Sequence, residues 1–120
     1  MMPSPSSGAK SFRLVSAAST NATSIKAKPG TLFTIAAFNI NAAIRYLKIY
    51  DLAVAPTVGT SVPVFTMVLP ATAISAISIN FGMLGMKFDN GIALALTTGL
   101  ADADTGAVAA NEQVVNLTYL

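Results

Sequence analysis

The stretch NGIALALTT, residues 90–98, decides the fold class of this chain. It begins with an Asn-Gly pair, which tolerates the positive φ of a tight turn. Large apolar residues then occupy every second position from Ile92 to Leu96, and Ala93 and Ala95 lie between them. A period of two residues is that of a β-strand. The stretch therefore predicts a buried strand with one large and one small face.

Other segments repeat this period between turn residues. In TLFTIAAFN, residues 31–39, the alternation places Leu32 on the face of Thr34 and opposite Ile35. Gly82 and Gly85 predict a turn and a bulge or close backbone approach. In total we expect eight or nine short antiparallel strands and no amphipathic helix. The fold class is all-β, a β-sandwich with a jelly-roll-like arrangement.

The domain organisation follows from length and local composition. A chain of 120 residues suffices for one domain. Residues 1–11 are rich in Pro, Ser and Gly and can bury little apolar surface, so they predict a flexible N-terminal arm that orders only against a partner. Residues 12–120 form the single β-sandwich domain.

The composition excludes several classes of function. The chain has no Cys and no His, which removes thiolate nucleophiles, structural zinc sites and histidine-based catalysis. We expect no enzyme, no catalytic residue, no cofactor and no metal. Hydrophobic residues make up 53% and charged residues only 10%, so part of the apolar surface is expected to meet another protein.

The longest segment without a charged residue runs from Leu52 to Met86. Three prolines, at 56, 63 and 70, and several glycines divide it into pieces shorter than the roughly 18 to 20 residues of a membrane-spanning helix. We expect no membrane insertion. Met83 and its neighbouring methionines are interpreted as filling gaps in the core, with an adaptable contact surface as the alternative.

Charges are distributed unevenly along the chain. Every basic residue except Lys87 lies in the first 50 residues, and every acidic residue lies after them. If the fold separates the two groups, neighbouring subunits or an acidic shell can dock by complementary charge.

Asp102 and Asp104 raise the question of a cation site. Calcium requires six to eight oxygen ligands, and this stretch supplies few. Aspartates also start turns by accepting hydrogen bonds from their own backbone. We interpret the pair as a polar turn and keep a cation site as the alternative.

Strand residues 45–50, RYLKIY, place Leu47 and Ile49 opposite a basic and aromatic face. Such a face can stack nucleic-acid bases or pack against a neighbouring subunit with the tyrosine hydroxyls in water. We favour packing and expect no specific nucleic-acid binding. The candidate contact residues for a partner are Lys10, Arg13, Arg45, Tyr46, Lys48 and Tyr50.

Four segments together resemble small virion proteins of tailed phages and prophages: RLVSAASTNATSIKAKPG, RYLKIYDLAVAPTVGTSVPV, the proline that closes VFTMVLP, and GIALALTTG with its continuation ADADTGAVAANEQVVNLTY. The resemblance covers residues 13–120 and consists of turns and strand edges. It implies a capsid decoration, or cement, protein, which is commonly a homotrimer. Its partners would be the major capsid protein and sister subunits. It would be made in the host cytoplasm and would lie on the capsid surface.

Two alternatives come from other functional classes. One is a tail, baseplate or fibre module that binds host glycan, for which the absence of Trp is unfavourable. The other is a single-strand nucleic-acid binder that uses Arg45 and the residues after it, and its affinity would fall steeply with salt.

Overall fold

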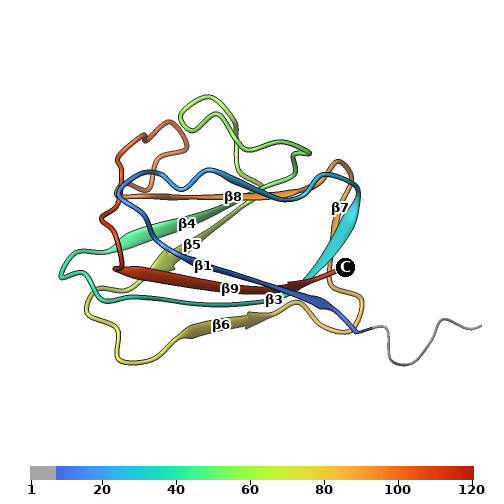
Figure 1. Ribbon diagram of the computed structural model, residues 1–120, viewed down its shortest axis with the longest axis horizontal. Helices are drawn as coiled ribbons and strands as arrows, with labels where there is room; N and C mark the ends of the chain where they lie inside the picture. Colours follow the sequence, from blue (N-terminus) through green and yellow to red (C-terminus); the bar gives the residue numbers. More distant parts are fainter. Residues whose placement is uncertain (1–7) are drawn as a thin grey trace, which may run out of the picture.

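Two antiparallel sheets face each other in the computed structural model, which describes residues 8–120 (Figure 1). The described part contains nine strands and no helix, which confirms the all-β β-sandwich. The strands are β1 Lys10–Val15, β2 Thr23–Lys26, β3 Gly30–Asn39, β4 Arg45–Tyr50, β5 Phe65–Leu69, β6 Ile77–Asn80, β7 Met86–Phe88, β8 Ile92–Thr97 and β9 Gln113–Tyr119.

The strand order is jelly-roll-like. Sheet A has the order β1-β9-β3-β6, and sheet B has the order β2-β8-β4-β5. Strand β7 also pairs with β3, at Gly30–Leu32, while β6 pairs with the same strand at Thr34–Ala37. Because β6 and β7 follow each other along one partner, they form a single strand interrupted by residues 81–85. Counted this way, the sandwich has four strands in each sheet.

The start of the domain lies slightly before the predicted boundary. Strand β1 begins at Lys10, which is opposite Tyr119 of β9. Lys10 and Ser11 were predicted to belong to the flexible arm, and they belong to the first strand instead. Residues 1–7 of the predicted arm lie outside the described residues.

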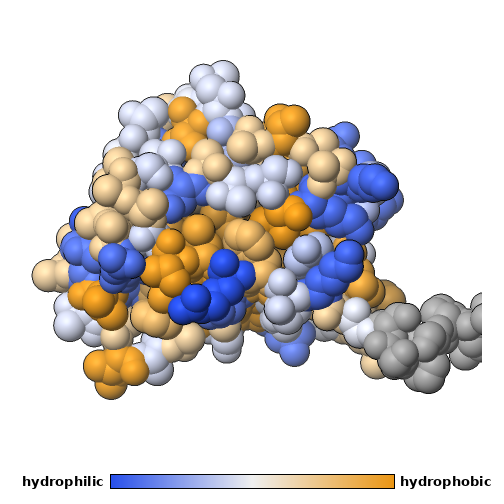
Figure 2. Space-filling view, viewed as in Figure 1, coloured by the Kyte–Doolittle hydropathy of each residue, from blue (hydrophilic) through white to orange (hydrophobic). Residues whose placement is uncertain are grey.

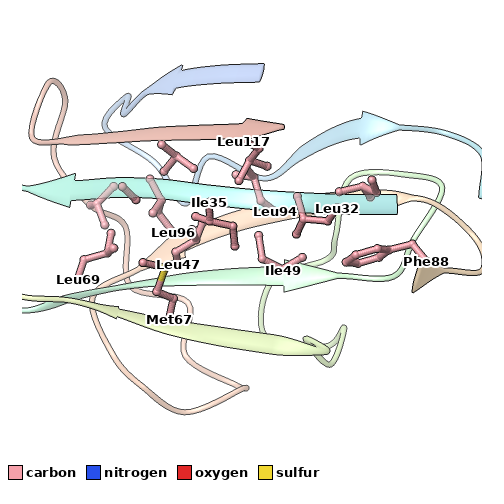
Figure 3. Packing of buried hydrophobic residues seen from close by; sticks show 14 residues of the cluster. Leu32, Ile35, Leu47, Ile49, Met67, Leu69, Phe88, Leu94, Leu96 and Leu117 are labelled. Carbon is pink, nitrogen blue, oxygen red and sulfur yellow. The ribbon is translucent and has the colours of Figure 1, made fainter. Parts of the chain in front are cut away.

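The core consists of the inner faces of the two sheets. Leu32, Ile35 and Leu117 of sheet A point toward side chains of sheet B such as Ile49 and Leu94 (Figure 3). All of β8 is buried, with Leu94 fully shielded from solvent. Large apolar side chains at alternate positions thus explain why these segments form strands, since each inner face is removed from water.

One strand departs from simple alternation. The pairing of β3 with β9 shifts between Leu32 and Thr34, which is the signature of a β-bulge. As a result Leu32 lies on the buried side with Ile35 and Ala37. The prediction that Leu32 shares a face with Thr34 is wrong, because the extra residue of the bulge reverses the alternation at this point.

Two long connections cover the outer face of sheet B. They are residues 51–64, after β4, and residues 98–112, after β8, and both lie above β8 in Figure 1. Beneath them Ala93 and Ala95 pack with Tyr50 in a second buried cluster. The small face of β8 therefore suits close packing, as its sequence predicts, and the material packed there is the chain's own loops.

Candidate interaction surfaces

Basic residues gather on the first strand of each sheet. Lys10 and Arg13 are exposed on β1, Lys26 is half-buried on β2, and Lys28 is exposed in the turn after it. Strands β1 and β2 are edge strands, since each pairs with only one other strand. We call these four residues the basic edge. Hydrophilic groups over β1 and β9 on the face drawn in Figure 2 belong to the same side of the sandwich.

No residue of the basic edge forms an ion pair within the part of the chain that the structure describes. Between residues 8 and 120 the one ion pair joins Lys87 Nζ to Asp89 Oδ1 at 3.3 Å, and both side chains are largely exposed. The charges of the basic edge are therefore available to a partner of opposite charge.

Two of the candidate contact residues are not accessible. Lys48 and Tyr50 are completely buried under the loops that cover sheet B. Lys48 Nζ donates a hydrogen bond of 2.5 Å to the carbonyl oxygen of Ala101, which ties the second loop to β4. The Tyr50 hydroxyl is buried without a hydrogen-bond partner among the described residues. Burial raises the pKa of Tyr50, and the negative charge of Asp102 adds to the effect.

The predicted basic and aromatic face is consequently wrong for Lys48 and Tyr50. Their alternation with Leu47 and Ile49 is as predicted, so they do lie on the outer side of sheet B. That outer side is covered because two distant loops fold across it, which no local pattern in residues 45–50 reveals.

Arg45 and Tyr46 are half-exposed at the beginning of the same strand. Arg45 Nη1 donates to the carbonyl oxygen of Ile44 at 3.1 Å. These two residues belong to sheet B, whereas Lys10 and Arg13 belong to sheet A. The six candidate residues therefore do not form one surface, and among them only Lys10 and Arg13 are exposed.

On the opposite side of the sandwich, β5 and β6 carry no charged residue, whereas β7, the continuation of β6, carries Lys87. Strands β5 and β6 are the other two edge strands, and the rings of Phe65 and Phe81 meet there with centroids 5.6 Å apart in an edge-to-face arrangement. This contact closes the space between the sheets. We call residues 62–84 the uncharged edge, because the whole segment lies within the run from Leu52 to Met86 that has no charged residue.

Large apolar side chains are exposed along the uncharged edge. Ile74 is 100% exposed, Met83 94% and Leu84 91%, and an apolar protrusion marks the loop between β5 and β6 at the lower left of Figure 2. Three valines complete the set of six: Val62, Val64 and Val68. Side chains with this exposure cost free energy in water unless a partner covers them.

The interruption between β6 and β7 explains two of these side chains. Gly82 and Gly85 both have positive φ, at 85° and 72°, which confirms the predicted turn and bulge. The bulge turns Met83 and Leu84 outward. The interpretation of Met83 as a core residue is therefore wrong, although Met67 is buried as that interpretation requires.

The carboxylates of the loops support backbone turns. Asp104 Oδ1 accepts a hydrogen bond of 2.8 Å from the backbone of Gly106, as expected for an aspartate that starts a turn. Asp102 is exposed nearby. Residues 8–120 contain no group of three or more acidic side chains arranged to hold a metal ion.

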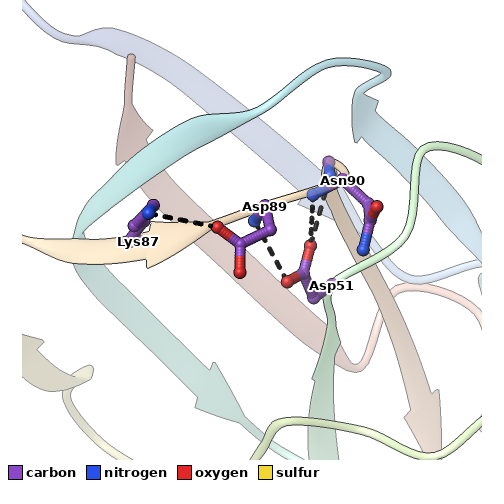
Figure 4. A network of polar contacts seen from close by, with 5 residues as sticks. Asp51, Lys87, Asp89 and Asn90 are labelled. Carbon is purple, nitrogen blue, oxygen red and sulfur yellow. Dashed lines mark hydrogen bonds and ion pairs between the residues drawn. The ribbon is translucent and has the colours of Figure 1, made fainter.

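Asp51 plays the same part for the turn at 89–91. Its carboxylate accepts backbone N–H groups from Asp89 at 3.1 Å, Asn90 at 2.8 Å and Gly91 at 3.3 Å (Figure 4). Burial acts to raise the pKa of Asp51, but these hydrogen bonds outweigh it and the pKa is lowered overall. The turn before β8 is thus held by a residue from the end of β4.

Residues 8–120 form no pocket, so the accessible features of the described part are its two edges and its loops. The same residues include no helix with the length and hydropathy needed to cross a bilayer.

Comparison with known proteins gives no matching family, no matching curated protein and no matching solved structure.

The uncharged edge is the surface that the sequence analysis did not assign. The sequence feature that indicates this surface is the run from Leu52 to Met86, which contains no charged residue. Locating it on one side of the sandwich requires the strand order, because only that order shows β5 and β6 to be edge strands.

Proposed function

We propose that this chain is a non-enzymatic structural protein of a phage virion, which attaches to the assembled capsid as a homotrimer and stabilises it. The observation that carries the proposal is the separation of two contact surfaces, with a basic edge at β1 and β2 and an uncharged edge at β5 and β6. A protein with two such surfaces is suited to joining neighbours within an assembly. The virion context rests on the resemblance of residues 13–120 to phage proteins.

The size of the uncharged edge supports adhesion. Complete burial of a large aliphatic side chain contributes about 1.5–3 kcal/mol. The three valines are already partly buried, so complete burial of the six side chains contributes at most on the order of 10 kcal/mol, comparable with the roughly 4–15 kcal/mol that association costs in lost freedom of motion. The edge is therefore large enough to make up much of an interface when neighbouring backbone and side chains contribute as well.

The basic edge suits contact with an acidic surface. Lys10 and Arg13 extend from the exposed strand β1, and no carboxylate within residues 8–120 neutralises them. Attraction between such a surface and a negatively charged shell accelerates encounter and fixes orientation. It weakens as salt is added, because the Debye length shortens to roughly 8 Å at 0.15 M.

A protein can stabilise a shell by binding alone, without catalysing a reaction. A protein that binds the assembled lattice and not the free capsid subunit shifts the assembly equilibrium toward the lattice by mass action. We assign this role to the chain, with capsid subunits at the basic edge.

The test uses particles of the phage whose genome encodes the chain, prepared with its gene deleted. The purified full chain is mixed with these particles, and binding is measured by co-sedimentation and by cryo-electron microscopy. We expect β-rich density on the shell. We also expect Arg13→Glu to weaken binding about tenfold at 50 mM salt, with a smaller loss at 500 mM.

Lys87→Glu is the matched control, because it makes the same change of charge at an exposed residue on β7. It should leave binding unchanged. Bare shells would reject the proposal, and protein found on the tail would redirect the search to host glycan.

A further inference from the structure

The Asn90-Gly91 pair that precedes β8 has a reactivity of its own. It is the one place in the sequence where glycine follows asparagine. The backbone nitrogen of the residue after an asparagine can attack the carbonyl carbon of the asparagine side chain, and glycine permits this most readily because it has no Cβ to hinder the approach. Asn90 is exposed, so water reaches its side chain. The pair is therefore a candidate site of covalent modification.

The reaction is a deamidation, which needs no enzyme and no cofactor. The Gly91 nitrogen loses its proton and forms a bond to Cγ of Asn90, which closes a succinimide ring. The bond from Cγ to Nδ2 breaks, and Nδ2 leaves with that proton as ammonia. Water then opens the ring. Attack of water at Cγ leaves aspartate on an ordinary main chain, whereas attack at the backbone carbonyl carbon leaves isoaspartate, whose main chain runs through Cβ and Cγ.

The folded chain opposes the first step at the attacking atom. The Gly91 nitrogen donates its hydrogen to Asp51 Oδ1 at 3.3 Å, and the Asn90 nitrogen donates to the same oxygen at 2.8 Å (Figure 4). To attack, the Gly91 nitrogen must give up this hydrogen and become negative beside a carboxylate. Negative charges at so short a distance repel each other, so Asp51 disfavours the deprotonated nitrogen.

The main chain at Gly91 is also held away from the Asn90 side chain. Gly91 is buried, and a Cβ placed on it would lie 2.5 Å from the carbonyl oxygens of both Lys26 and Leu52. Gly91 does not have a positive φ, so glycine is needed here for space and not for its backbone conformation. Ring closure requires rotation of the main chain between residues 90 and 91. Strand β2 and the loop after β4 block that rotation from two directions.

We propose that Asn90 is a latent deamidation site that Asp51 keeps unreactive in the folded protein. This property does not depend on the virion role. It gives Asp51 a second effect besides holding the turn, because the hydrogen bonds that fix residues 89–91 also prevent succinimide formation. Local opening of the turn, with loss of the Asp51 contacts, releases the Gly91 nitrogen and allows the reaction to start.

Deamidation at this position would damage the fold. The Asp51 carboxylate approaches the backbone of both Asp89 and Asn90, so a new carboxylate at residue 90 would add a third negative charge to the turn. Isoaspartate would lengthen the main chain by one methylene directly before β8, all of whose residues are buried. Such a shift disturbs the register that places alternate side chains in the core.

The test follows deamidation of the full chain at neutral pH by mass spectrometry of its proteolytic peptides, which distinguishes Asn90 from the other asparagines. The native chain is compared in buffer and in concentrated guanidinium chloride, where it is unfolded. We expect the folded chain to react at least about tenfold more slowly at Asn90. Asp51→Ala should raise the rate in the folded chain about tenfold, the factor that corresponds to loss of a hydrogen bond to a charged group.

Two variants serve as controls. Asp89→Ala is the matched control, because it removes a carboxylate from the same turn and keeps the backbone hydrogen bonds to Asp51. Leu94→Ala controls for overall stability, since it opens a cavity in the core and leaves the Asp51 contacts in place. Both should react at the native rate. Circular dichroism establishes that each variant is folded.

If Asp51→Ala does not fold, Asp51→Asn takes its place. It keeps an acceptor oxygen without the charge and should raise the rate several-fold, because a neutral hydrogen bond is weaker. Three results would each overturn the proposal: equal rates at Asn90 in the folded and unfolded native chain, a native rate in a folded Asp51 variant, or an acceleration by Asp89→Ala or Leu94→Ala as large as that of the Asp51 variant.

Discussion

Replacing Tyr50 by Phe should stabilise this protein, although most substitutions of buried residues destabilise. The Tyr50 side chain is fully buried, and its hydroxyl has no hydrogen-bond partner among the described residues. A buried polar group left without a partner costs about 1–3 kcal/mol. Tyr50→Phe removes that group and keeps the ring that packs against Ala93 and Ala95. We expect the free energy of unfolding to rise by about 1 kcal/mol.

The assay is urea denaturation at pH 7 together with calorimetry. For a chain of this length a gain of 1 kcal/mol corresponds to an increase in Tm of about 4 °C. Tyr46→Phe is the matched control, because Tyr46 lies on the same strand and the same outer side but is half-exposed. The control should change stability by less than about 0.5 kcal/mol.

The pH dependence provides a second readout. The pKa of Tyr50 is raised above its ordinary value of 10.0 in the folded protein, so the folded state holds the phenolic proton more tightly than the unfolded chain. Below pH 10 the phenol is protonated in both states, and its titration does not change the free energy of unfolding. As the pH rises through 10 toward the folded pKa, the unfolded chain loses the proton first and the free energy of unfolding falls. Tyr50→Phe should abolish that loss. A variant less stable than the native chain at pH 7 would show that the hydroxyl has a stabilising partner and would refute the reasoning.

Three further substitutions test the turn, the bulge and the core. Asp51→Ala should lower the free energy of unfolding by about 1–2 kcal/mol, because three backbone N–H groups at 89–91 lose their acceptor. Since the pKa of Asp51 is lowered, its contribution is present above the unfolded value of about 3.9 and is lost as the pH falls through the folded pKa, so native chain and variant should converge in acid. Gly85→Ala should destabilise by at least about 1 kcal/mol, because φ is positive and the new Cβ would lie 2.5 Å from Thr31 Cγ2; an unchanged Tm would refute this. Leu94→Ala should cost about 2–5 kcal/mol in urea denaturation, and a loss below 1 kcal/mol would show that the core is not closed around it.

The parts of the fold that local alternation determines were predictable from the sequence. Ile92 and Leu94 face the core and Ala93 faces the opposite way, as the period of two requires. The turns at Gly82 and Gly85 were predictable for the same kind of reason, since glycine accepts the positive φ found there.

Features that depend on distant parts of the chain were not predictable. Leu32 is buried because its strand bulges against β9, a partner far away in sequence. Lys48 and Tyr50 are buried because loops at 51–64 and 98–112 cover their face of sheet B. Alternation indicates the side on which a residue lies, but not what covers that side.

The candidate surfaces also combine features that local sequence determines with features that depend on distant parts of the chain. The exposed position of Arg13 agrees with its place on a strand that alternates polar and apolar residues. The uncharged edge was visible in sequence as a run without charge, yet the same run could equally have formed a core. Strand order decides between the two, because it makes β5 and β6 the last strands of their sheets.

Strand β9 lies between β1 and β3, although the ribosome makes it after every other described strand. During synthesis, β1 and β3 have no common neighbour until residues 113–119 emerge, so sheet A cannot close before that point. Pairing over such sequence distances is slow compared with local folding. A chain ended early by premature termination would leave apolar strand faces exposed to chaperones and proteases. Only molecules translated through β9 can therefore complete sheet A, and shorter products are expected to keep apolar strand faces that chaperones and proteases recognise.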